Sequence, residues 1–249
     1  LFLIVFSIVF SQECSNGRYE EEIFDNIYVT SGVYYGSNIQ EGIFGNTNED
    51  LYLDIYEPYG DSLEDRPVVI FMFGGSFIGG SRTSSDIVEL CTRYAKRGYV
   101  AVAIDYRLTL DLLIFANETT AYKAASKGIH DLKGAIRFLR MNDELYNDYR
   151  IDSNRIYAGG VSAGGISAVN AAYLDQDSEI PAFIEDWLED NGGLEGNSGN
   201  EGYDSSFHGV INLCGAVGET DWIAEDDLPI VNLHGTSDDV VPYGDGLIT

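Results

Sequence analysis

The chain of 249 residues is long enough for one large α/β domain, and its 45% hydrophobic content permits a sizeable core. Its 41 acidic residues against 14 basic ones give a formal net charge of −27. A surface this negative repels nucleic acid and anionic membranes, so neither is an expected partner. We expect a solvated acidic surface rather than a specific cation site.

The chain begins with an apolar run, Leu1 to Phe10, that is followed at once by polar residues. This run is too short to span a bilayer as a helix, which takes about 20 residues, so stable membrane insertion is not expected. It matches the apolar core of a secretory signal peptide, although no basic segment and no initiator Met precede it. We therefore predict a signal-peptide remnant over residues 1–12 and a secreted protein, extracellular or periplasmic. A buried N-terminal strand is the alternative.

Export permits disulfide bonds, and the chain has three cysteines, Cys14, Cys91 and Cys214. Cys214 follows an apolar run and is expected at the buried end of a strand. Cys14 and Cys91 are expected near the surface, so we predict that these two form a disulfide. Unpaired cysteines are the alternative, because three cysteines allow three pairings.

The predicted elements alternate along the chain. Residues 27–36 and 51–57 alternate apolar and polar side chains, as in an antiparallel pair at a sheet edge. Short strands are predicted over 68–73, 100–104, 155–159, 210–213 and 230–233, and helices over 84–97, 118–141 and 166–174. Strands that alternate with helices indicate a mostly parallel sheet covered on both faces. The predicted class is α/β with antiparallel N-terminal edge strands.

Residues 185–206 form an acidic insertion rich in Gly and Asn. We expect a mobile surface loop, because this composition favours irregular, exposed backbone. A lid over the site and a calcium-binding loop are the alternatives, although the carboxylates do not have the spacing of an EF-hand. No metal site is therefore predicted.

Ser162 is the first candidate for catalysis. It lies at the centre of Gly160-Val161-Ser162-Ala163-Gly164, between a predicted strand and a predicted helix. Flanking glycines allow a sharp turn that exposes the serine at the N-terminus of the helix. A serine hydroxyl also needs a base and donors for the oxyanion before it can act as a nucleophile. A packing turn is the alternative for this motif alone.

Two further motifs support a catalytic serine. Phe73-Gly74-Gly75-Ser76-Phe77 ends a predicted buried strand, where glycines let backbone amides point into a site. His234-Gly235-Thr236-Ser237-Asp238-Asp239 follows the last predicted strand. Taken together in this order, the three motifs resemble the α/β-hydrolases, in particular the carboxylesterases and the secreted bacterial esterase and polyester-depolymerase branch. The resemblance covers about residues 27–245.

This resemblance implies roles for five residues. Ser162 would be the nucleophile, and the backbone N–H groups of Gly75, Ser76 and Ala163 would form the oxyanion hole. Asp238 would be the acid that orients the catalytic histidine, with Asp239 as the neighbouring alternative. The chain departs from the family pattern at Phe73, where a histidine is usual, and at Ser76, where a third glycine is usual. No metal and no cofactor are implied.

The catalytic histidine is the residue that the pattern lacks. It should follow Asp238, but the only histidines are His130, His208 and His234. We expect His130 on the surface or flank of its helix, His208 before a strand, and His234 in a structural role. The expectation is a longer protein whose last strand, helix and histidine lie outside this chain. A complete but inactive protein is the alternative.

The predicted function is therefore that of a secreted serine esterase acting on small or polymeric carboxylic esters through an acyl-enzyme. We expect the chain as it stands to have little activity, because an elbow serine without its imidazole loses several orders of magnitude in rate. The alternatives are a serine peptidase of the same fold and a non-catalytic binding module. Incomplete C-terminal elements would leave a sheet edge and an apolar face uncovered.

Overall fold

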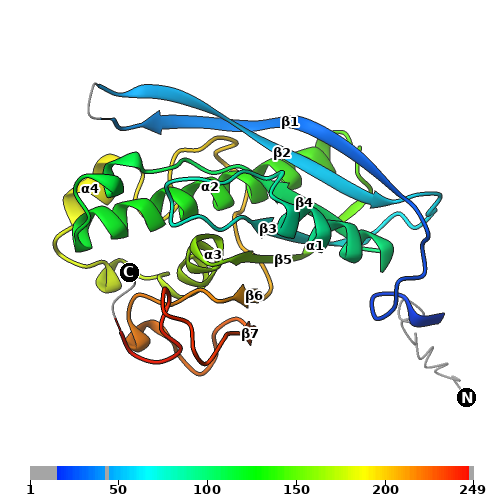
Figure 1. Ribbon diagram of the computed structural model, residues 1–249. Coiled ribbons are helices and arrows are strands. Elements are labelled where there is room, and N and C mark those ends of the chain that lie inside the picture. Colours follow the sequence, from blue (N-terminus) through cyan, green and yellow to red (C-terminus); the bar gives the residue numbers. More distant parts are fainter. Residues whose placement is uncertain (1–15, 43–44, 247–249) are drawn as a thin grey trace, which may run out of the picture.

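The computed structural model describes residues 16–42 and 45–246. It contains one seven-stranded sheet with the order β1-β2-β4-β3-β5-β6-β7 (Figure 1). The strands are β1 (Ile27–Gln40), β2 (Thr47–Pro58), β3 (Arg66–Met72), β4 (Val100–Ile104), β5 (Ile151–Val161), β6 (Val210–Leu213) and β7 (Ile230–Leu233). The helices are α1 (Ser85–Lys96), α2 (Glu118–Leu145), α3 (Ala163–Tyr173) and α4 (Glu185–Asp190), with short 3-10 turns η2 (Leu110–Leu113), η3 (Asp177–Glu179) and η4 (Thr220–Trp222).

The first two strands form the antiparallel edge that the alternating pattern predicts. β1 pairs with β2, and β2 pairs antiparallel with β4, so β1 is the edge strand. The hairpin runs along the top of Figure 1 above α2. From β4 to β7 all neighbouring strands are parallel, which confirms the predicted mixed α/β sheet.

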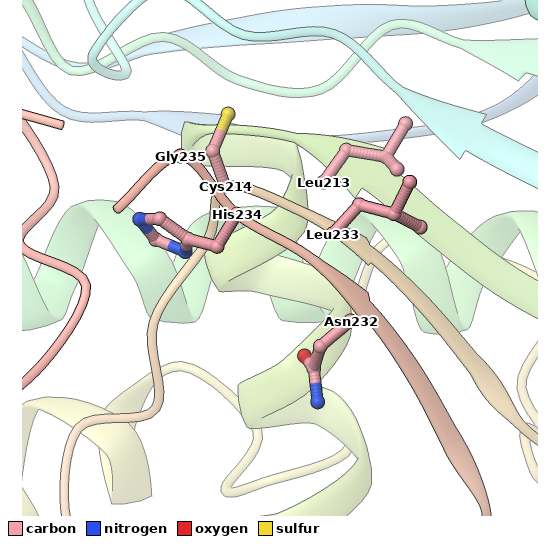
Figure 2. Close-up of a pocket in the computed structure, with 6 residues that line it drawn as sticks. All are labelled: Leu213, Cys214, Asn232, Leu233, His234 and Gly235. Carbon is pink, nitrogen blue, oxygen red and sulfur yellow. The ribbon is translucent and has the colours of Figure 1, made fainter. Parts of the chain in front are cut away.

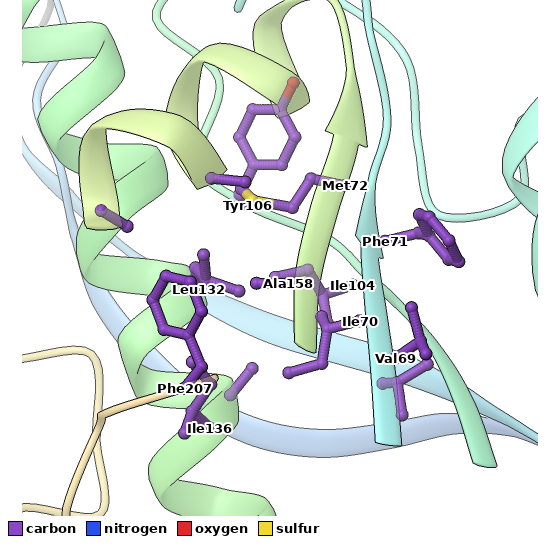
Figure 3. Close-up of a cluster of buried hydrophobic side chains, with 14 of the residues drawn as sticks. Val69, Ile70, Phe71, Met72, Ile104, Tyr106, Leu132, Ile136, Ala158 and Phe207 are labelled. Carbon is purple, nitrogen blue, oxygen red and sulfur yellow. The ribbon is translucent and has the colours of Figure 1, made fainter. Parts of the chain in front are cut away.

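The central strand β3 is buried on both faces, as its continuous apolar run predicts. Figure 3 shows Val69 and Phe71 on one side of β3, with Ile70 and Met72 on the other side. The Phe71 ring lies 5.2 Å from the Tyr94 ring of α1. Ile70 and Met72 face the side chains that α2 contributes to the core (Figure 3). Helix α1 therefore covers one face of the sheet, and α2 covers the other together with α3.

The insertion is folded against α2 and is not the mobile loop that its composition suggested. It begins with α4, and its Glu195 carboxylate receives a 2.8 Å hydrogen bond from the Lys133 ammonium. The Arg137 guanidinium donates to the backbone oxygens of Glu195 and Gly199 at 3.1 and 2.9 Å. Lys133 and Arg137 are consequently buried, although both carry a charge. Their charges are balanced by carboxylate and carbonyl oxygens rather than by water.

The expectation for His130 was also wrong. Its side chain is 1% exposed, stacks parallel to the Trp187 ring of α4, and its Nε2 lies 2.8 Å from the Gly193 oxygen. Removal from water lowers the pKa of His130 to about 4, and the nearby Arg107 charge adds to the effect. The insertion therefore buries a residue that the helix pattern alone leaves exposed.

Cys91 was expected near the surface, but it is fully buried on the sheet side of α1, and it has no disulfide partner among the described residues. Burial raises the pKa of this thiol well above its ordinary value. Cys14 lies outside the described residues, so its pairing with Cys91 stays a prediction. The signal-peptide remnant over residues 1–12 lies outside them too.

β7 is the second edge of the sheet, and it is exposed. Val231 and Leu233 each keep 58% of their surface open to solvent. A groove of about 250 Å³ runs beside this edge on the face covered by α1, and its walls include Tyr94, Tyr99 and Tyr157.

Within the described part of the chain, no helix has both the length and the apolar character that a membrane crossing requires.

Candidate active site

Ser162 occupies the turn between β5 and α3. Its backbone has φ 52° and ψ −116°, a conformation that side chains other than glycine rarely adopt. The neighbouring glycines are required by space, because a Cβ at Gly160 would lie 2.3 Å from the Gly164 carbonyl carbon, and one at Gly164 would lie 2.3 Å from the Met72 oxygen. The turn thus holds a strained, half-buried serine at the N-terminus of a helix.

The loop after β3 lies directly against this serine. A Cβ at Gly74 would lie 3.3 Å from the Ser162 Cβ. The next three residues, Gly75, Ser76 and Phe77, all have positive φ, at 132°, 53° and 61°. Such a run turns successive backbone N–H groups away from the pattern of a strand. Among the described residues, none accepts a hydrogen bond from the N–H of Gly75 or Ser76.

Ala163 begins α3, so its backbone N–H belongs to the first turn, which has no acceptor within the helix. It is the third of the predicted oxyanion donors and follows Ser162 in the chain. The structure therefore places Gly75, Ser76 and Ala163 in the two segments that meet at Ser162. Their role towards an oxyanion stays a prediction.

An aromatic stack braces the loop where a histidine is usual. The Phe73 ring lies 4.3 Å from the Tyr106 ring at an interplanar angle of 20°, and the Tyr106 hydroxyl donates a 2.8 Å hydrogen bond to the Phe73 oxygen. The Thr109 N–H donates to the Phe77 oxygen at 2.6 Å. Phe73 thus supports the loop through stacking, and the segment after β4 holds it in place.

Three ion pairs surround this segment, and sequence reasoning did not find any of them. The Arg82 guanidinium pairs with Asp54 at 2.9 Å and with Asp105, and so ties the start of α1 to β2 and β4. The Arg107 guanidinium pairs at 3.0 Å with Asp131 of α2, and both side chains are at most 1% exposed. Asp54 and Arg107 lie among mostly apolar residues in the sequence, but nothing there pairs them with Arg82 and Asp131.

Asp238 lies in a turn after β7. Its Oδ1 accepts hydrogen bonds from the N–H groups of Val240 and Val241, each at 2.9 Å. These bonds lower the pKa of the Asp238 carboxyl, the one from Val241 most. Its Oδ2 lies 3.6 Å from Nε2 of His234, whose ring lies 2.8 Å from the Val241 oxygen. The carboxylate therefore closes its own turn, and its orienting role stays a prediction.

The ends of β5, β6 and β7 lie side by side in that order. The Ser162 N–H donates to the Leu213 oxygen at 2.8 Å, and the Cys214 N–H donates to the Leu233 oxygen at 2.9 Å. An open cavity of about 610 Å³ adjoins the last two strand ends. Its lining residues are Leu213, Cys214, Asn232, Leu233, His234 and Gly235, with the Cys214 and His234 side chains pointing in different directions (Figure 2).

No histidine of the chain is placed to activate Ser162. His234 is two strands away, which is about 10 Å at the usual strand spacing. The His208 N–H bonds to the Ile156 oxygen, six residues before Ser162, so it lies roughly 20 Å away along β5. His130 is buried beneath the insertion. Ser162 and Asp238 therefore both follow the carboxyl ends of parallel strands, and no imidazole lies between them.

This sheet, with a strained serine at a strand-to-helix turn and a glycine loop against it, defines a carboxylesterase-like α/β-hydrolase. The chain belongs to the BD-FAE family, whose model matches residues 53–218, more than half of the sequence. That match includes Ser162 and the loop after β3, and it ends before Asp238.

Solved structures share the fold. Esterase 2 of Thermogutta terrifontis phosphorylated by paraoxon has a TM-score of 0.58 and 23% identity over 84% of this chain and 74% of that one. The propionate-bound form of that esterase has a TM-score of 0.58 and 24% identity, over 84% of this chain and 75% of that one.

A relative by sequence is Carboxylesterase 3B of Mus musculus. It is 31% identical over 109 residues, which are 43% of this chain and only 18% of that protein.

Proposed function

We propose that this protein is a carboxylic ester hydrolase that acts through Ser162. The observation that carries the proposal is the strained turn that presents Ser162 beside Gly74 and at the N-terminus of α3. A non-glycine residue held in such a conformation is characteristic of functional sites. Membership of the BD-FAE family and the likeness to esterases support the same activity.

The reaction follows from the groups around the serine. The Ser162 hydroxyl oxygen attacks the ester carbonyl carbon as its proton passes to a base. The carbonyl oxygen becomes an oxyanion that accepts hydrogen bonds from the N–H groups of Gly75, Ser76 and Ala163. The C–O bond breaks, the alcohol leaves with a proton, and an acyl-enzyme remains. Water then attacks the acyl carbon, and the acid leaves as Ser162 regains its proton.

The chain as it stands should perform this reaction slowly, because none of its three histidines lies beside Ser162. Water would have to accept the serine proton, and loss of an aligned imidazole costs several orders of magnitude in rate. We therefore propose that the nucleophile and the oxyanion site are competent, and that these residues have no aligned base to accept the serine proton.

Imidazole in solution tests this directly. We expect that added imidazole raises the rate of p-nitrophenyl butyrate hydrolysis by the chain above the rate with Ser162→Ala, which corrects for hydrolysis by imidazole itself. Paraoxon, which phosphorylates the Thermogutta esterase, should label Ser162 faster when imidazole is present. Equal rates for the two chains, together with no labelling at Ser162, would contradict the proposal and favour the binding module.

We also propose that the protein is secreted. The apolar run Leu1 to Phe10 and the net charge of −27 support export. Expression from the gene with its native leader in a secreting host tests this. We expect the product in the medium, with an N-terminus at or shortly after residue 12; a cell-retained product that keeps Leu1 would contradict it.

A further inference from the structure

A turn near the candidate site displays four apolar side chains to solvent. Leu110, Leu113, Ile114 and Phe115 have exposed fractions of 57%, 66%, 62% and 58%. We call these four residues the apolar turn. Scattered apolar residues on a surface are ordinary, but a contiguous exposed group marks a surface that meets another apolar phase.

The apolar turn is held rigidly at its backbone. η2 lies within it, and the N–H groups of Ile114 and Phe115 both donate to the Asp111 oxygen, at 3.1 and 2.8 Å. At its end, the Asn117 side chain donates to the Phe115 oxygen at 2.9 Å and caps α2. The side chains are therefore presented by an ordered segment rather than by a loose strand.

The apolar turn also connects to the candidate site. It follows β4, whose carboxyl end lies at the same edge of the sheet as the loop after β3. The Thr109 N–H bonds to the Phe77 oxygen, and Phe77 belongs to the loop that lies against Ser162. A surface that covered the apolar turn would thus lie at the edge where an ester must enter.

The charges near the apolar turn restrict the kind of surface that it can contact. Asp111 lies within the apolar turn and Glu118 begins α2 directly after it. The Lys127 ammonium interacts electrostatically with Asp111, but it is buried and paired with Glu41. The whole chain carries a net charge of −27. An anionic surface would be repelled, so the partner is apolar and uncharged.

We infer that the apolar turn docks the protein onto the surface of a water-insoluble neutral ester, of the triacylglycerol kind, and brings Ser162 to its substrate. This rests on the proposed function, because it names the physical form of the substrate at that site. Docking itself requires no chemistry at Ser162 and is measured separately.

The experiment compares binding to triolein droplets coated with phosphatidylcholine, in a Ser162→Ala background that cannot hydrolyse them. The test variant is Leu113→Ser with Ile114→Ser and Phe115→Ser. The matched control is Leu145→Ser with Tyr146→Ser at the other end of α2, where both side chains are equally exposed, at 55% and 65%. All five positions are exposed, so circular dichroism should show folded proteins.

We expect the parent to sediment with the droplets and the triple variant to bind at least about tenfold more weakly, because burying even one such side chain changes the affinity by roughly that factor. The control should bind as the parent does. Overturning results are no binding by the parent, equal binding by the triple variant, or a preference for vesicles containing phosphatidylserine. A parent dimer that the triple variant loses, without droplet binding, would assign the turn to a second copy of the chain instead.

Hydrolysis separates the two proposals. With the serine restored, a chain that cleaves soluble p-nitrophenyl butyrate but ignores droplets overturns only the docking. A chain that docks but never reacts at Ser162 overturns only the proposed function.

Discussion

The hydroxyl of Ser198 donates a 2.6 Å hydrogen bond to Oδ1 of Asp131, the carboxylate that pairs with Arg107. Ser198 is fully buried, and it also accepts a 3.0 Å hydrogen bond from the Asn38 side chain of β1. One residue of the acidic insertion therefore joins the edge strand, the long helix and the buried ion pair behind the candidate site. A buried carboxylate with these partners is stable only while the insertion is in place.

Gly36 leaves the space that this arrangement needs. A Cβ there would lie 1.8 Å from the Ser198 carbonyl oxygen, a backbone atom that cannot move alone. We expect Gly36→Ala to lower the free energy of unfolding by about 3 kcal/mol, because it pushes the insertion away from β1. Urea unfolding measures this. Gly235→Ala, where an added Cβ meets nothing within 4 Å, is the control. Equal stability of both variants would show that the insertion does not pack as described.

We expect the backbone conformation of Ser162, which serves the proposed function, to lower the free energy of unfolding. Its positive φ is unfavourable for any residue with a Cβ. We expect Ser162→Gly to raise the free energy of unfolding by about 1 kcal/mol, after the larger entropy of glycine in the unfolded chain is subtracted. Ser162→Ala keeps the Cβ and should leave stability nearly unchanged. Thermal unfolding of both variants tests this, and a glycine variant less stable than the alanine variant would contradict it.

His130 should make the fold sensitive to acid. Its pKa is lowered from 6.5 to about 4 in the folded state, first by burial and then by the Arg107 charge. The unfolded chain therefore binds the extra proton first, so stability is complete above pH 6.5 and falls as the pH drops towards 4. From pH 7 to pH 5 this amounts to about 2 kcal/mol.

His130→Gln, which keeps a donor for the Gly193 oxygen, should flatten that part of the pH profile of urea unfolding. His208→Gln is the control, because His208 is exposed and has no such burial. A profile that stays equally steep after His130→Gln would assign the acid sensitivity to the carboxylates of the insertion.

The cysteines should differ in reactivity. Cys214 is half-buried and lines the open cavity, whereas Cys91 is fully buried with a raised pKa. We expect iodoacetamide to alkylate Cys214 in the native protein and to leave Cys91 unmodified, as read by peptide mass spectrometry. In denaturant without reductant, Cys91 should stay protected by the predicted disulfide with Cys14 until reductant is added. An immediate reaction of Cys91 there would show a free thiol and contradict that pairing.

The exposed edge at β7 should cause self-association. Val231 and Leu233 offer apolar side chains beside unpaired backbone groups, a template for strand pairing. We expect Val231→Lys to lower the amount of aggregate measured by light scattering at high protein concentration. Tyr59→Lys, at a residue that is 68% exposed between β2 and β3, is the control and should have a smaller effect. An equal effect of both substitutions would point to net charge rather than to the edge.

The sequence located most elements because their signals are local. β4, β6 and β7 have the bounds that their apolar runs predict, and the three predicted helices, α1 to α3, begin and end within a few residues of expectation, whereas α4 was not expected. Ser162 was located in the same way, since a sharp strand-to-helix turn requires glycines that can be read in a single motif. The same holds for Gly75 and Ser76 after the buried strand.

Long-range contacts were not readable in this way. The sequence by itself determined the order of strands and helices, the position of Ser162, and the lack of a histidine after Asp238. Only the tertiary structure decided that the insertion lies on α2, that Lys133 and His130 are buried there, and that Phe73 replaces a polar brace by stacking on Tyr106. Periodicity reports which face of a helix is apolar, but a polar face is buried when a distant segment supplies its hydrogen bonds.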